Sequence, residues 1–370
     1  MRLFQTFALG ECILQNRIVM APMTRSRADF QGNVSALAPT YYAQRASAGL
    51  VISEAIAISR QAHGYPFTPG IWTAEQIAGW RAVTDAVHSK SGVICAQLWH
   101  VGRVFASANN PLALEAVAPS AVAAEGQMFT KAGLVPLPIP RALTTDEVRQ
   151  VAADFGAAAA RALGAGFDLV ELHAANGYLI EQFISDDANR RRDHFGDSPD
   201  ARLNFLRLVF DEVERQAGGL GRIGIRLSPY GDFNGIKHSN PGQVFDLLLD
   251  LLQTRQPAYL HLIEPSVSGD GSRRTANGEA ARDVLAIARS RFDGPVIACA
   301  DYNAERAEQA LKDKRADLIA FGRPFISNPD LVERIREGVA LAPWDRSTFY
   351  TRGEKGYTDY LPFAHALLQH

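Results

Sequence analysis

Eight short apolar runs, each followed by a longer amphipathic stretch, most restrict what this chain can fold into. The apolar runs are Arg17–Met23, Leu50–Ile56, Val93–Trp99, Phe167–His173, Arg222–Ser228, Ala258–Glu264, Pro295–Ala300 and Ala316–Gly322. The stretches with a helical pattern include Ala74–Ser89, Thr145–Leu163, Ala201–Gln216, Pro241–Gln253, Glu279–Arg291, Ala304–Lys312 and Pro329–Glu337. Nearly continuous apolar runs are typical of parallel strands that are buried on both faces. The sequence therefore predicts an α/β fold, a (β/α)8 barrel, with an open doubly wound sheet as the alternative.

Two long segments lie outside this repeat. Residues 102–141 follow the third strand, contain five prolines and are too long for a simple loop, so we expect a functional excursion there. Residues 344–370 follow the last helix and include the Gly- and Tyr-rich piece Gly353–Tyr360, which we expect to fold back over a site. The run Arg190–Asp193 is expected to be a solvated loop face. The whole of residues 1–370 is expected to form one domain.

Composition and charge exclude several classes of protein. The chain has 38 Lys and Arg against 40 Asp and Glu, and this net charge of -2 argues against nucleic acid or an anionic membrane surface as the main partner. No apolar run approaches the roughly 18 residues of a membrane-spanning helix, and the N-terminus does not resemble a signal peptide. Cys12, Cys95 and Cys299 lie far apart, which excludes a cysteine-bound iron–sulfur cluster and suits a reducing, cytoplasmic location. The histidines are scattered, so we expect no metal site.

Gly219–Gly224 spells the GxGxxG pattern of dinucleotide-binding domains. That motif needs a strand before it and a helix after it, so that the pyrophosphate meets the helix N-terminus. Here the order is reversed, because a helix-like stretch precedes the glycines and a strand-like run follows them. The segment is therefore interpreted as the end of a helix and a turn.

The fourth strand ends in a group of polar residues, and catalytic residues of such barrels lie at the C-terminal ends of strands. His173 and Asn176 could together hold one oxygen of a ligand, as a two-donor oxyanion clamp does. Tyr178 follows after a glycine, and its ordinary pKa of about 10 suits donation of a proton to a carbanion-like centre. The structural alternative is a satisfied core histidine and a packing aromatic.

Two arginines at strand ends also attract attention. Arg226 is a charge within an apolar strand, so it needs either an anionic ligand or a structural ion pair with an acid such as Glu54 or Glu264. Arg323 follows the last strand, where such barrels place a phosphate, unless it is a surface arginine. Only six residues are Lys, and none of them is placed at a strand end, which argues against a phosphosugar aldolase.

These segments together resemble the old yellow enzyme family, the ene-reductases that depend on flavin mononucleotide (FMN). The matching pieces run in order over essentially the full chain: Asn16–Arg27, Tyr41–Leu50, Gln97–Arg103, His173–Phe183, Gly224–Pro229, Ala320–Pro329 and Gly356–Tyr360. The resemblance implies a single FMN-binding (β/α)8 barrel with the flavin at its C-terminal mouth. It also implies NADPH or NADH as the co-substrate.

The resemblance further implies a role for each site residue. FMN would be held by Pro22, Met23, Thr24, Gln97, Arg226, Gly322 and Arg323, with Arg226 stabilising the anionic reduced flavin. His173 and Asn176 would grip the substrate oxygen, and Tyr178 would be the proton donor. The substrate pocket would have Tyr65, Trp99 and Tyr357 as aromatic walls. One departure is Asp301, which stands where the family usually has a glycine-rich phosphate loop, and we expect its side chain to point away from the phosphate.

The implied reaction is a ping-pong reduction of an α,β-unsaturated carbonyl or nitro compound. Hydride would pass from flavin N5 to the β-carbon, and Tyr178 would protonate the α-carbon. The alternative on the same flavin site is reduction of nitrate esters or nitroaromatics, and the non-catalytic alternative is a flavin-binding sensor. The sequence leaves open the physiological alkene, its stereochemistry, the choice between NADH and NADPH and the oligomeric state.

Overall fold

The chain folds into a closed barrel of eight parallel strands, which confirms the predicted fold class. A computed structural model describes residues 1–270 and 282–363. The barrel strands are β3 (Ile18–Met20), β4 (Leu50–Ile52), β6 (Ile94–Trp99), β11 (Leu169–Ala174), β12 (Ile223–Leu227), β13 (Tyr259–Ile263), β14 (Val296–Cys299) and β15 (Leu318–Phe321). Their order follows the chain, and the pairing of β6 with β11 completes the ring. Each lies inside a predicted apolar run, except that β11 ends one residue later; the second run also holds the start of β5 (Ile56–Ala57).

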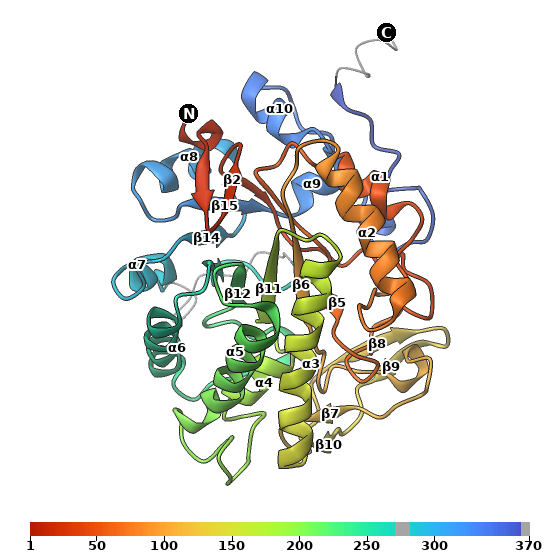
Figure 1. Ribbon diagram of the computed structural model, residues 1–370, viewed down its shortest axis with the longest axis vertical. Helices are drawn as coiled ribbons and strands as arrows, with labels where there is room; N and C mark the ends of the chain where they lie inside the picture. The colour runs from red at the N-terminus through yellow and green to blue at the C-terminus, as the bar shows by residue number, and fades with distance from the viewer. Residues whose placement is uncertain (271–281, 364–370) are drawn as a thin grey trace.

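Helices surround these strands (Figure 1). They are α1 (Ala38–Ala43), α2 (Ala74–His88), α3 (Thr145–Gly164), α4 (Leu179–Ile184), α5 (Asn204–Ala217), α6 (Pro241–Arg255), α7 (Val284–Arg289), α8 (Ala304–Lys312), α9 (Arg323–Ser327) and α10 (Leu331–Glu337). Thr73 and Thr144 begin α2 and α3 with capping boxes, in which the threonine hydroxyl and a Gln or Glu side chain satisfy the free N–H groups. Positions 279–281 of the predicted helix Glu279–Arg291 lie outside the described residues.

An N-terminal hairpin covers the end of the barrel at which its strands begin. Its strands β1 (Phe7–Leu9) and β2 (Cys12–Leu14) pair in antiparallel fashion, and Leu9 and Leu14 pack with interior residues such as Val19 and Leu318. Inside the barrel, Gly224 of β12 leaves room for the Tyr259 ring of β13, because a Cβ at Gly224 would lie 2.2 Å from that ring. The GxGxxG segment is a helix end and turn, as predicted, since α5 stops at Gly218 in the left-handed conformation.

The excursion after β6 carries its own small sheets. It holds β7 (Val117–Ala118) and β10 (Arg141–Ala142), which pair in parallel, and the hairpin of β8 (Gln127–Thr130) with β9 (Gly133–Pro136). These strands lie beside the start of α3 in Figure 1. The excursion therefore covers one side of the barrel.

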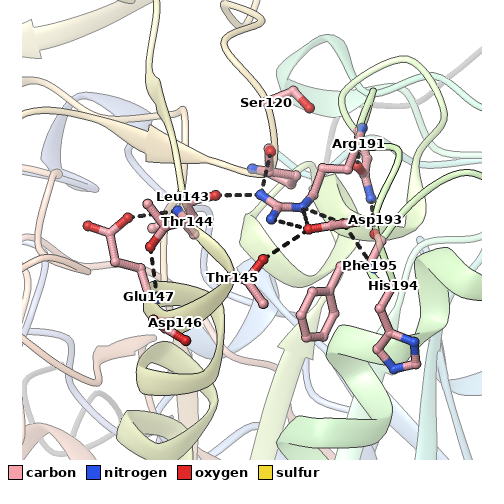
Figure 2. Close-up of polar contacts among 12 residues, drawn as sticks. Ser120, Leu143, Thr144, Thr145, Asp146, Glu147, Arg191, Asp193, His194 and Phe195 are labelled. Atoms are coloured by element: carbon pink, nitrogen blue, oxygen red, sulfur yellow. Dashed lines mark hydrogen bonds and ion pairs between the residues drawn. The ribbon is translucent and has the colours of Figure 1, made fainter.

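Arg191 joins this excursion to the loop after β11, so the prediction of a solvated run is wrong at that residue. Its side chain is only 10% exposed and forms an ion pair with Asp193 at 2.6 Å. It also donates to the backbone oxygens of Pro119 and Leu143, while Asp193 accepts from Thr145 at the start of α3 (Figure 2). The guanidinium has more donors than one carboxylate can satisfy, which explains why it gathers carbonyls.

The C-terminal segment is bound to the loop after β3 by two buried arginines. Arg25 donates to the backbone oxygens of Phe349 and Gly356. Arg27 donates to the backbone oxygens of Thr348, Phe349, Gly353 and Lys355. The segment thus folds back onto the C-terminal end of the barrel, as expected. Among the described residues, no helix has the length and apolar character needed to cross a membrane.

Candidate functional site

Four aromatic rings meet at the C-terminal end of the barrel, and they come from β6, from β11 with the turn that follows it, and from the loop after β5. Trp99 ends β6, His173 is near the end of β11, and their rings are parallel within 8° at a centroid distance of 6.5 Å. Tyr178 lies edge-on to both, 4.8 Å from Trp99 and 5.0 Å from His173. Tyr65, from the loop after β5, accepts a hydrogen bond from the Tyr178 hydroxyl, with the two oxygens 3.2 Å apart. Two residues selected at the end of the fourth strand, His173 and Tyr178, and two expected as pocket walls, Tyr65 and Trp99, therefore share one cluster.

Burial fixes the protonation states in this cluster. It lowers the pKa of His173 well below its usual value, and the positive charges of Arg226 and His261 lower it further. His173 is therefore a neutral imidazole at physiological pH, and its Nδ1 has no hydrogen-bond partner within residues 1–270 and 282–363. Burial and the neighbouring Tyr65 raise the pKa of Tyr178 well above 10, so its hydroxyl keeps its proton. The pair offers neutral donors to a ligand.

Asn176 stands between these two residues on a turn of unusual backbone conformation. Its φ of 59° and the 75° of Gly177 both fall in the left-handed region. Asn176 is buried, and its Oδ1 lies 2.8 Å from where a Cβ on Gly269 would be. The turn therefore reverses the chain between the His173 strand and Tyr178, which begins α4.

Below the aromatic cluster, the barrel interior holds a connected layer of polar side chains. Gln97 donates to Glu171 at 2.8 Å, and Tyr259 and His261 contact the second carboxylate oxygen at 3.1 and 2.8 Å. Burial opposes charge on both Glu171 and His261. Even so, His261 holds the pKa of Glu171 below its usual value, and Glu171 raises the pKa of His261. Glu171 and His261 therefore form a buried ion pair.

Arg226 lies next to this layer and has an unusual lack of partners. It is 7% exposed, and its Nη2 lies 3.5 Å from the Cys299 sulfur, while its Nε has no hydrogen bond among the described residues. Within the described residues, no carboxylate lies within 4.0 Å of the guanidinium, which removes the structural ion pair with Glu54 or Glu264 as its explanation. A buried guanidinium with free donors requires an acceptor from a ligand.

The residues selected around the first and last strands also converge. Pro22, Met23 and Thr24 follow β3 and are half-buried, and Gly322 follows β15 near Met23. A Cβ on Gly322 would meet only Met23 Sδ, at 3.8 Å, so the space above this glycine is open. Arg323 starts α9, and its guanidinium lies 5.3 Å from the centre of the Trp344 ring. The backbone oxygen of Asp301 accepts from Arg306.

Tyr357 does not join the aromatic cluster, so its selection as a pocket wall finds no support in its surroundings. It has no exposed surface, stacks on Tyr41 at 4.0 Å and lies under the guanidinium groups of Arg25 and Arg27. Its function is to anchor the C-terminal segment. Tyr350, in the same segment, is 61% exposed and is among the groups that raise the pKa of Tyr178, after burial and Tyr65.

Several other residues of the site escaped the sequence analysis. Asn234, in the loop after β12, donates to the backbone oxygen of Asn176 at 2.8 Å and lies against the hydroxyls of Tyr65 and Tyr178. Glu171 carried a usable signal, because it is a charge in an apolar strand two residues before His173 and so faces the same side. The sequence gives no comparable signal for His261 or Cys299, because each resembles an ordinary core residue. The part of the chain that is described contains no group of three or more metal-ligating side chains.

Comparison with known proteins identifies the family. The model of the NADH:flavin oxidoreductase / NADH oxidase family matches residues 2–342. The chain belongs to this family. It includes the old yellow enzyme of the resemblance, and its members are enzymes that carry FMN and take electrons from a nicotinamide nucleotide.

Individual members of the NADH:flavin oxidoreductase family are similar over nearly the whole chain. The flavin oxidoreductase hxnT of Emericella nidulans is 43% identical, covering 98% of this chain and 97% of that protein. The 12-oxophytodienoate reductase 1 of Oryza sativa subsp. japonica is 41% identical, covering 98% and 93%. Morphinone reductase in complex with tetrahydroNAD superposes with a TM-score of 0.89 at 46% identity, covering 97% of each chain.

The residues at the barrel mouth fit an FMN cofactor. The free Nε of Arg226 suits an anionic or carbonyl edge, and the Gln97 amide lies in the adjoining layer. The open space above Gly322 suits close approach of a ligand to the backbone. The site therefore offers a buried positive charge, as an anionic cofactor requires.

Proposed function

We propose that this chain is an FMN-dependent ene-reductase. It would use NADH or NADPH to reduce the activated C=C bond of an α,β-unsaturated carbonyl or nitro compound. The observation that carries this proposal is the ring cluster, in which the neutral His173 and the protonated Tyr178 lie 5.0 Å apart by their ring centres. A proton donor beside a carbonyl-binding donor is what addition of hydride and proton across a polarised alkene requires.

The cofactor would be held by the residues that line the barrel mouth. Pro22, Met23 and Thr24 would line one side of FMN and Gln97 the pyrimidine edge, and Gly322 and Arg323 would hold the phosphate. Arg226 would supply positive charge beside the edge that becomes anionic on reduction, which gives its free Nε an acceptor. When bound, FMN supplies the hydride, and the protein supplies orientation and electrostatics.

At the substrate, each side chain would have a separate task. His173 and Asn176 would donate to the carbonyl or nitro oxygen and draw electron density toward it. The Tyr178 hydroxyl would hold its proton until the α-carbon becomes basic, and the raised pKa of Tyr178 keeps the proton in place until then. Tyr65 and Trp99 would enclose the alkene and exclude water.

The remaining features of the proposal concern the chain as a whole. We infer that residues 1–370 act as one FMN-binding unit, because the matched family model and the tail contacts span nearly all of it. The three cysteines are free thiols, which supports a reducing compartment such as the cytoplasm. The substrate would be a small electrophilic alkene.

Transfer of label from the nicotinamide tests the proposal. Purified protein is given 2-cyclohexenone and a nicotinamide nucleotide that carries deuterium at its transferable position, and the product is analysed by mass spectrometry and NMR. We expect cyclohexanone with deuterium at the β-carbon only when the protein is present. Oxidation of the nicotinamide by air with the enone unchanged would contradict the proposal. A parallel run with a nitroaromatic compound tests the alternative substrate class.

A further inference from the structure

The turn that carries Asn176 is held almost entirely by side chains. The Asn176 N–H donates to Ser228 Oγ at 2.8 Å, and the Gly177 N–H donates to Glu181 Oε2 at 2.6 Å. The two carbonyls of the turn are equally occupied, since Asn176 O accepts from Asn234 and Gly177 O accepts from Gln182 at 2.7 Å. Two consecutive left-handed residues cannot make the ordinary backbone ladder, so these four side chains replace it.

Glu181 is the centre of this arrangement. Its carboxylate accepts from the Gly177 N–H and also from the Ser228 hydroxyl, at 3.2 and 3.3 Å. Ser228 in turn accepts from Asn176, so the one carboxylate fixes the N–H groups of both left-handed residues. Glu181 and Ser228 are buried, and His238, 3.7 Å from Glu181 Oε1, is too far for a hydrogen bond.

We propose that Glu181 is a positioning residue that acts through Ser228 and the Gly177 N–H to aim the Asn176 amide at the substrate oxygen. This inference rests on the proposed function, because it takes Asn176 as an oxygen-binding donor. The Tyr178 N–H closes the same turn by donating to the Ala175 backbone oxygen, but its ring is also held by contacts outside the turn, with Tyr65 and Trp99. Loss of Glu181 should therefore misplace Asn176 while Tyr178 keeps its place.

Two variants at Glu181 separate positioning from simple destabilisation. Glu181→Met keeps the length of the side chain but leaves the Gly177 N–H and the Ser228 hydroxyl without an acceptor. Glu181→Gln keeps one acceptor oxygen, so it should rescue most of the effect and remains informative if the Met variant folds poorly. Glu308→Met is the matched control, because Glu308 is equally buried and accepts the N–H groups of Arg2 and Leu3, which belong to the N-terminal segment.

The first measurement is steady-state reduction of 2-cyclohexenone by FMN-loaded protein. We expect Glu181→Met to lower kcat/KM by about 100-fold, the size of effect that a small misplacement of a reacting group produces. Glu181→Gln should lose less than about tenfold, and Glu308→Met should keep wild-type kinetics with lower thermal stability. Wild-type kinetics in Glu181→Met would overturn the inference.

A double-mutant cycle then tests whether Glu181 acts through Asn176. Asn176→Gly removes the amide and tolerates the left-handed conformation. If Glu181 works only by aiming that amide, Glu181→Met should change kcat/KM less than about threefold in the Asn176→Gly background. Full multiplication of the two effects would overturn the inference, because Glu181 would then act elsewhere.

Hydrogen exchange of the peptide around residues 174–183 provides a readout that needs no activity. Glu181→Met should exchange the turn amides at least about tenfold faster than wild type, and Glu308→Met should not. Unchanged exchange would contradict the positioning role even in an active enzyme. The two proposals can fail separately. If the wild-type protein binds FMN but leaves every enone unchanged, while Glu181→Met still exchanges the turn amides faster than wild type, the proposed function is overturned and the positioning of the turn is not.

Discussion

Replacing Glu171 by Gln should weaken both the fold and the binding of FMN. Glu171 has no exposed surface and accepts from Gln97, Tyr259 and His261. An amide in its place leaves the charged His261 without an anion, and breaking a buried ion pair in this way costs about 3–5 kcal/mol. The amide keeps one acceptor oxygen where the carboxylate offered two to Gln97, Tyr259 and His261, so Gln97 is held less firmly, and a loss of about 1 kcal/mol there weakens the Kd for FMN roughly fivefold.

Chemical denaturation and flavin titration measure the two effects of Glu171→Gln separately. Unfolding of the FMN-free protein is followed by circular dichroism, and FMN binding by quenching of flavin fluorescence. The double variant Glu171→Gln with His261→Asn is the control, since replacing both partners removes the unpaired charge and should recover much of the stability. A single variant that unfolds at the wild-type denaturant concentration would refute the ion pair and, with it, the explanation of how Gln97 is held.

Three further predictions concern the proton donor, the C-terminal segment and acid stability. Tyr178→Phe should slow enone reduction by about 10²–10⁴-fold while flavin reduction by the nicotinamide stays nearly intact, and equal losses in stopped-flow measurements of both half-reactions would remove Tyr178 as the donor. Arg27→Met should free residues 348–356, because their four carbonyl contacts are lost, and limited proteolysis should cut there first; a wild-type cleavage pattern would contradict the anchoring role. Burial lowers the pKa of His100 to about 3, so the unfolded chain takes up this proton first as the pH falls below about 6.5, and the folded state loses stability down to pH 3. His100→Asn does not titrate, so its unfolding free energy should fall less over this range, by up to ~4 kcal/mol, and parallel curves would contradict the assignment.

Strand-rich runs predicted the barrel because a parallel strand buried on both faces leaves an unmistakable pattern. Short elements have no comparable sequence pattern. The hairpin of β1 and β2 and the six-residue helices α1 and α4 gain their stability from packing against the barrel, and their sequences alone are too short to specify them. Arg191 shows the same limit, since a run of charges next to a loop looks solvated until the excursion supplies its carbonyl partners.

The candidate site was predictable where the chain order of the strands brings residues together. Trp99 and His173 lie at the ends of the adjacent strands β6 and β11, and Tyr178 follows β11 after a short turn, so strand order predicts their contact. Tyr357 belongs to an irregular segment, and only its contacts with Tyr41, Arg25 and Arg27 show that it lies outside the ring cluster. Glu181 was not selected because its importance comes from the left-handed turn before it, and a backbone conformation at a non-glycine residue has no reliable signal in sequence.

Anaerobic single turnover tests the central claim most directly. Protein loaded with FMN is first mixed with one equivalent of NADPH or NADH in the absence of oxygen, and the yellow colour is followed as it bleaches. A small cyclic enone is then added. The account predicts that the yellow colour returns and that one equivalent of saturated ketone forms. Colour that stays bleached with the enone and returns only on admission of air would contradict it.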